Sequence, residues 1–172
     1  LWAGPWMLNI TGYTPLQSAT GLFWINITML ISYFIWGYIL PKISDYGISS
    51  IKLIKLGLPI SYFSLFLIIY FGNNAGAFLF TIYIMTSIVI SLTQPAIALN
   101  FSKNLAGKSL TSFNVFLFSG TFFVQWGIGL VIDLCNNKGF DVLSSYRISF
   151  SLFLILCVLS YIFFIYLNRN EN

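Results

Sequence analysis

Four long stretches of this chain carry no charged side chain, and they limit its fold more than any other feature. They are Leu1–Pro41, Leu56–Ser102, Ser109–Ile132 and Ile148–Asn168. A helix needs about 20 mainly apolar residues to cross the roughly 30 Å hydrocarbon core of a bilayer. Only 7% of all residues are charged, whereas about 25% is usual for a soluble domain. The sequence therefore predicts an all-α, polytopic transmembrane bundle.

Turn signals divide these stretches into spans of one transmembrane domain, 1–172. Gly72-Asn73-Asn74-Ala75-Gly76 marks a turn, and Pro95, which lacks a backbone N–H, predicts a local break in its helix. We expect the end of one helix at about 1–12 and complete spans at about 16–40, 53–71, 77–100, 109–134 and 148–167. The first helix is expected to begin earlier, in a longer protein. We expect 53–71 and 148–167, which are almost wholly aliphatic and aromatic, to face lipid.

The basic residues indicate the orientation of the spans. Those that lie in the connections and the tail assigned to one side are Lys42, Lys52, Lys55, Lys103, Lys108 and Arg169. By the positive-inside rule that side, with the C-terminus, is cytoplasmic, and we expect a bacterial inner membrane. Because the basic residues sit between apolar spans and not on one exposed face, we predict no nucleic-acid binding. Trp2, Trp6 and Tyr13 suit an interfacial aromatic belt.

The chain is poorly supplied with residues for catalysis or metal binding. It has no histidine and four acidic residues, none of them clustered, so general acid–base catalysis and metal ligation lack their usual groups. We predict that the chain is not an enzyme and has no metal site and no cofactor. Cys135 and Cys157 are interpreted as small apolar packing residues.

Polar side chains recur on single faces of the apolar spans. In 109–134 the polar residues Asn114, Thr121 and Gln125 share one sector of a helical wheel. A polar group without a partner in hydrocarbon costs several kcal/mol, so this stripe should face protein or water. A second stripe in 77–100 includes Tyr83. The predicted lining of a substrate cavity is Asn114, Phe118, Thr121, Gln125, Trp126, Gln94, Ser87 and Asn26.

Two alternatives stay open for these polar residues. Hydrogen bonds between helices could use the same side chains merely to hold the bundle together. Asp133, at the outer end of 109–134, is either an interfacial carboxylate in contact with water or a residue of gating or ion coupling.

Several motifs together resemble a known family. They are Trp2-Ala3-Gly4-Pro5-Trp6, the run from Trp36 to Lys42, Ala106-Gly107-Lys108, and the run from Gln125 to Asp133. With them the chain resembles the C-terminal half of a major facilitator superfamily transporter, from the end of helix seven to helix twelve. The resemblance implies a gating loop at Gly37 and Lys42, with Pro41 where the family has an acid. It also implies that helices nine and twelve lie toward lipid.

The predicted function is transport of a small solute by alternating access in a secondary transporter. The implied partners are the lipid bilayer, a six-helix N-terminal half, the substrate and a coupling ion. The alternative is a membrane protein that does not transport, either a partner in an assembly or the remnant of a truncated gene. The sequence does not separate these two functions.

Overall fold

The computed structural model describes residues 2–169, and this part of the chain contains helices and no strand. The α-helices are α1 Ala3–Asn9, α2 Pro15–Asp45, α3 Ser50–Phe71, α4 Ala77–Ser87, α5 Thr93–Asn100, α6 Lys103–Asn137 and α7 Val142–Leu167; two 3₁₀ segments are η1 Gly72–Asn74 and η2 Ile88–Leu92. Five helical segments are long and apolar enough to cross a membrane. The prediction of an all-α chain with five such spans is confirmed, and the chain has the character of an integral membrane protein.

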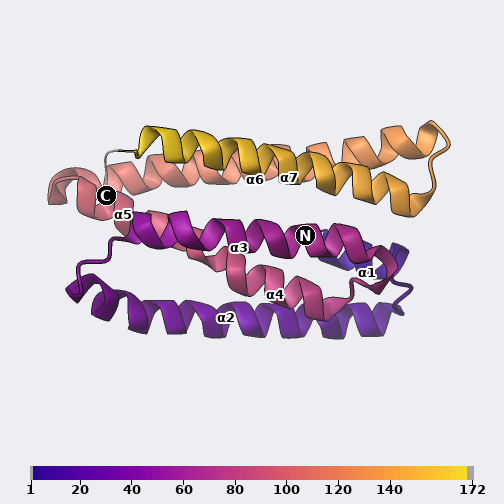
Figure 1. Ribbon diagram of the computed structural model, residues 1–172, viewed down its shortest axis with the longest axis horizontal. Helices are drawn as coiled ribbons and strands as arrows, with labels where there is room; N and C mark the ends of the chain where they lie inside the picture. Colours follow the sequence, from indigo (N-terminus) through magenta and orange to yellow (C-terminus); the bar gives the residue numbers. More distant parts are fainter. Residues whose placement is uncertain (1, 170–172) are drawn as a thin grey trace.

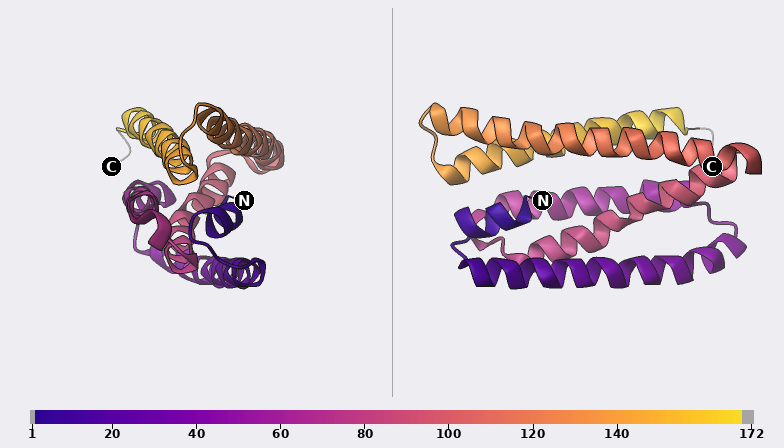
Figure 2. Two further views of the ribbon diagram at one scale, coloured as in Figure 1. Left: turned by 90° about the vertical axis from the view of Figure 1, so that its right-hand side faces the viewer. Right: turned by 180° about the vertical axis from the view of Figure 1, so that it is seen from behind.

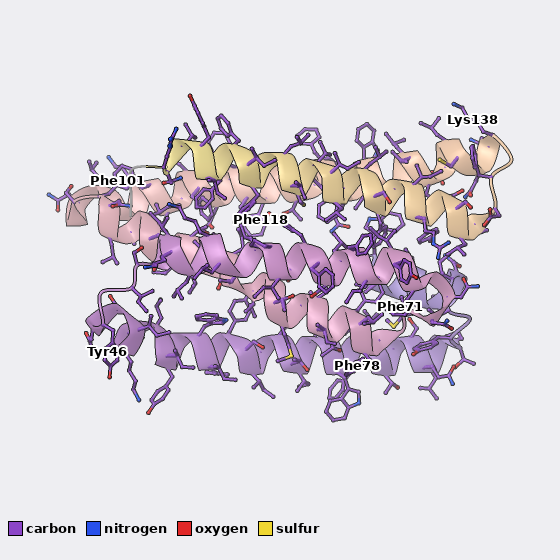
Figure 3. The ribbon with its side chains drawn as sticks, in the orientation of Figure 1. Tyr46, Phe71, Phe78, Phe101, Phe118 and Lys138 are labelled. Atoms are coloured by element: carbon purple, nitrogen blue, oxygen red, sulfur yellow. The ribbon has the colours of Figure 1, made fainter. Side chains whose placement is uncertain are left out.

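The long helices lie side by side in three tiers (Figure 1). The pair α6 and α7 forms one tier, α3 with α4 and α5 forms the middle one, and α2 forms the third. Helix α3 packs on α4 and α7, while α6 packs on α5 and α7. The α2–α3 and α5–α6 connections lie at the same end of the bundle as the C-terminus; Figure 3 labels Tyr46 and Phe101 there, and Lys138 at the opposite end. The basic connections therefore share one end.

Several helices extend beyond the predicted spans. Helix α2 continues past Pro41 to Asp45, α6 begins at Lys103 and α7 begins at Val142. The predicted bounds followed the apolar runs, whereas capping side chains mark where helices begin. Thr14 and Gln17 form a reciprocal capping box at the start of α2, and Asp141 accepts a hydrogen bond from the Ser144 amide at the start of α7.

The predicted break before Pro95 is confirmed. Because Pro95 has no N–H to donate to the carbonyl one turn earlier, the helix tightens into the 3₁₀ segment η2 before it resumes as α5. Val89 of η2 is 3% exposed, and a Cβ added to Gly57 of α3 would lie 2.9 Å from both of its methyl groups. Glycine therefore lets α3 approach the broken helix closely.

Helix α1 lies inside the bundle at one end, on the side away from α3 and α7 (Figure 2). Trp6 and Met7 are 0% exposed. The Trp6 ring lies 4.8 Å from the ring of Phe150 and 6.1 Å from that of Phe80, between centroids. The prediction that Trp6 belongs to an interfacial belt is wrong, because α1 folds inward and makes this side chain part of the core.

Helix α3 has one packed face and one exposed face. One face is buried against α4 and α7, with Leu65 and Ile68 in the core and Ser61 and Ser64 also buried. The opposite face is exposed and aromatic, and includes Phe66. Small hydroxyls among aliphatic residues therefore mark a packed face that the overall apolar character of the span concealed.

A pair of glycine substitutions tests the close approach of α3 to η2. We expect Gly57→Ala to lower the free energy of unfolding by about 1–3 kcal/mol, because the added methyl group overpacks the core. Gly37→Ala is the matched control, since open space surrounds Gly37, and it should leave stability unchanged or raise it by up to about 1 kcal/mol. Unfolding titrations in detergent measure both. Equal effects of the two variants would contradict the packing.

The Asp141 cap predicts a pH dependence of stability. Hydrogen bonds from Ser144 hold the pKa of the Asp141 carboxyl below its ordinary value. The folded-state pKa is thus lower than the unfolded one, so the cap stabilises the fold above the ordinary value of about 4 and loses this effect as the pH falls through the lower, folded-state pKa. We expect Asp141→Asn, which caps at every pH, to weaken the acid dependence of the thermal midpoint. An unaltered acid dependence in Asp141→Asn would contradict this role.

Candidate functional site

A cavity of about 350 Å³ lies among α1, α2, α3, α4, α6 and α7. Its lining is mostly aliphatic and aromatic, and no charged residue is present among the described residues that line it. Its polar side chains are Asn26 of α2, Tyr83 of α4, Gln125 of α6 and the indole of Trp2. Asn26 is exposed, so the cavity is open where α2 borders it.

Gln125 has the most unusual environment of the lining residues. Its backbone carbonyl accepts a hydrogen bond from the Trp2 indole nitrogen at 3.1 Å. Its side-chain Oε1 is buried and has no hydrogen-bond partner within the described part of the chain. Leaving a buried acceptor unpaired costs about 1–3 kcal/mol. The fold therefore holds an unpaired, buried carbonyl oxygen on a residue that lines an apolar cavity.

A second hollow of about 380 Å³ adjoins the same residue. It is lined by Trp2, Pro5, Phe122, Gln125 and Trp126, so the Trp2 indole and the Gln125 side chain border both spaces. Trp126 is 58% exposed. The structure thus brings together Asn26, Gln125 and Trp126 of the predicted cavity residues, from two helices that are distant in sequence.

The other predicted cavity residues lie outside these two hollows. Thr121 and Ser87 donate hydrogen bonds to carbonyls of their own helices, at 2.8 and 3.1 Å. Asn114 is half-buried and Gln94 is exposed, while Phe118 is 70% exposed and is labelled in Figure 3. These side chains lie on parts of α4, α5 and α6 that the described chain leaves partly or wholly uncovered.

The three residues predicted for gating or coupling lie away from the cavity. Gly37 is exposed and surrounded by open space. The Lys42 ammonium donates a hydrogen bond of 2.6 Å to the Tyr38 hydroxyl and lies 3.9 Å from the centre of its ring. Asp133 is exposed near the C-terminal end of α6. Lys42 and Asp133 lie near the C-terminal ends of α2 and α6. No group of three or more metal-ligating side chains forms among the described residues.

Two of the four polar lining residues, Tyr83 and Trp2, were not among the predicted cavity residues. Tyr83 was placed on the polar stripe of 77–100, and its spacing of four residues from Ser87, which puts both on one helical face, was a usable signal. Trp2 carried none, since its contact with Gln125 joins residues 123 positions apart.

No protein-family model, curated protein or solved structure matches this chain.

Replacing Gln125 by an apolar residue of similar shape tests whether its side chain is unpartnered. We expect Gln125→Met to raise the free energy of unfolding by about 1 kcal/mol, because it removes a buried acceptor that lacks a partner. Ser149→Ala is the control: Ser149 is 2% exposed and donates to the Ile128 carbonyl at 2.9 Å across the α6–α7 contact, so its loss should destabilise by about 1 kcal/mol.

Unfolding titrations of the protein in detergent measure both variants. If Gln125→Met destabilised as much as Ser149→Ala, the Gln125 amide would be holding helices together, and the unpaired oxygen would not exist in the folded protein.

Proposed function

We propose that this chain is the C-terminal half of a secondary transporter of the major facilitator type, which moves a small solute across the membrane by alternating access. The cavity between Asn26 and Gln125 is its solute site in this half. The observation that carries the proposal is the buried, unpaired Oε1 of Gln125, a residue that lines a cavity inside a bundle of helices long enough to cross a membrane. A fold that retains so unfavourable a group has a use for it when a ligand binds.

The position of the cavity supports this function. Asn26 and Gln125 lie in the interiors of α2 and α6, far from the ends of both helices. Secondary transporters bind solutes near the middle of the bilayer and form their sites partly from discontinuous helices. Here α4, which contributes Tyr83 and Phe80 to the cavity, is interrupted by η2 five residues after Tyr83.

The uncovered side of α6 supports the proposed companion half. Among the described residues of α6, only Ile128 and Ile132 are buried, and the amide of Asn114 lies on the same helix within the predicted span. Lipid is an unfavourable neighbour for an amide at depth. A six-helix N-terminal half, packed over the side where α1 lies between α2 and α6 (Figure 2), would cover this surface and enclose the cavity. The basic ends of the helices would face the cytoplasm in an inner membrane.

The hydrogen bonds weigh against the alternative of polar stripes that only hold helices together. Asn26 donates to the Leu22 carbonyl of its own helix at 2.7 Å, and the Thr121 and Ser87 hydroxyls also bond within their own helices. Hydrogen bonds between helices come from other residues, such as Asn9 to the Tyr146 hydroxyl at 2.8 Å. Asn26, Thr121 and Ser87 therefore do not supply the hydrogen bonds between helices that the alternative requires of them.

Thiol accessibility tests alternating access without knowledge of the solute. In full-length protein with every cysteine, Cys135 and Cys157 included, replaced by serine, we expect Asn26→Cys to react with a membrane-impermeant maleimide from both sides, in intact cells and in inverted vesicles. An outward-open state exposes the cavity to one side and an inward-open state to the other.

Phe66→Cys is the matched control, because Phe66 lies on the outer face of α3, 47% exposed, where lipid should prevent formation of the reactive thiolate. Reaction of Asn26→Cys from one side alone, or no more reaction than at position 66, would count against alternating access.

A further inference from the structure

The chemistry of the cavity wall restricts what it can bind. Carrying a charged solute into it would require an opposite charge, because an unpaired charge is very unfavourable in an apolar surrounding, and none lines the cavity among the described residues. The indole N–H of Trp2 is already used by the Gln125 backbone carbonyl. Two buried side-chain atoms of the described residues lack a partner, the Trp6 indole nitrogen and Oε1 of Gln125. Gln125 lines the cavity and Trp6 does not, so the unpaired atom that belongs to the cavity lining is an acceptor. The best complement is therefore an uncharged molecule that is mainly apolar and donates one hydrogen bond.

A cleft of about 450 Å³ leads toward this cavity from the outside of the bundle. It is lined only by α6 and α7 residues, among them Leu152 and Leu156, which are 46% and 61% exposed. In a transmembrane segment such exposed leucines face lipid. Gly127 also lines the cleft, and a Cβ added there would meet no atom within 4 Å. The cleft is thus an open, apolar recess on the membrane side.

The cleft and the cavity share a wall. Val124, Ile128 and Phe153 line both spaces, so a few side chains separate the lipid from the unpaired oxygen of Gln125. Side-chain rotamers change on time scales far shorter than transport cycles. A molecule dissolved in the bilayer can therefore reach the cavity by displacing this small apolar wall.

We propose that the cavity takes an uncharged, lipophilic solute with one hydrogen-bond donor, and that this solute enters from the bilayer between α6 and α7. The proposal deepens the proposed transport function and rests on it for the site. The donor of the solute pairs with Oε1 of Gln125, and its apolar body packs against Phe80, Phe150 and Phe153. The solute leaves lipid for a similarly apolar site, so the hydrogen bond supplies much of the selectivity.

Three related probes test the substrate class with full-length protein in nanodiscs. N-phenyl-1-naphthylamine is uncharged with one N–H donor, its N-methyl derivative lacks the donor, and 8-anilinonaphthalene-1-sulfonate adds a negative charge to the same skeleton. Binding is measured as saturable energy transfer from protein tryptophans, with empty nanodiscs as background. We expect the parent amine to bind. The affinity of each of the other two probes should be lower by a factor of about ten or more.

Gln125→Met should weaken binding of the parent amine about tenfold, the factor that one hydrogen bond supplies, and leave the N-methyl derivative unchanged. Equal binding of the amine and its N-methyl derivative, tighter binding of the sulfonate, or an unaffected Gln125→Met variant would each overturn the assignment.

The route is tested by stopped-flow binding of the same amine. Gly127→Leu should slow association and dissociation together and keep the equilibrium affinity, because it fills the cleft and not the cavity. Gly120→Leu is the matched control, since Gly120 also has open space around it but does not line the cleft. Leu152→Phe, on the other side of the cleft, gives a second variant if Gly127→Leu fails to fold. Unaltered rates in the folded cleft variants would exclude this entrance.

Failure of this inference and failure of the transport function give different results. Probe binding that depends on Gln125, without labelling of Asn26→Cys from both sides, would support the binding site and contradict the transport function. Labelling from both sides, without any preference for the parent amine, would support the transport function and contradict the proposed substrate class.

Discussion

In hydrocarbon every backbone and side-chain polar group must find its partner inside the protein, and this constraint organises the whole structure. The backbone satisfies it by forming helices. At the end of α3, where carbonyls lack partners, Arg147 donates hydrogen bonds to the Ile69 and Tyr70 carbonyls at 3.0 and 2.9 Å. The Tyr161 hydroxyl likewise donates to the Lys55 carbonyl at the other end. Among the described residues two buried side-chain atoms are exceptions, the Trp6 indole nitrogen and Oε1 of Gln125, and only Gln125 lines the cavity.

Helix α1 connects the surroundings of Gln125 to the hydrophobic core. Its Trp6 side chain packs among aromatic residues of α4 and α7, and the Ser18 hydroxyl of α2 donates to the Gly4 carbonyl. Gly12, at φ +69°, turns the chain from the end of α1 back into α2. Anchored in this way, α1 places the Trp2 indole beside Gln125 and forms one wall of the cavity. The packing core and the candidate site are thus parts of one arrangement.

The sequence was sufficient for those features that depend on local chemistry. Charge-free runs predicted the five spans, and the missing N–H of Pro95 predicted the break in the fourth. Features that depend on distant contacts were not predictable, because an apolar span conceals its packed face. Trp6 was assigned to the membrane surface although it is buried, and Trp2 was missed as a partner of Gln125. Gln125 itself was identified because an amide in a span is conspicuous wherever it faces.

The central claim is that the side-chain carbonyl of Gln125 has no hydrogen-bond partner until a solute binds. The chain has three glutamines, Gln17, Gln94 and Gln125, so glutamine labelled with ¹³C at the side-chain carbonyl gives few signals in an NMR spectrum of the full-length protein, and Gln125→Met assigns one of them. A carbonyl that accepts a hydrogen bond shifts downfield. We predict that saturation with N-phenyl-1-naphthylamine moves the Gln125 signal downfield and leaves the other glutamine signals, including those of Gln17 and Gln94, in place. A Gln125 signal that stays unmoved while the amine is bound would contradict the account.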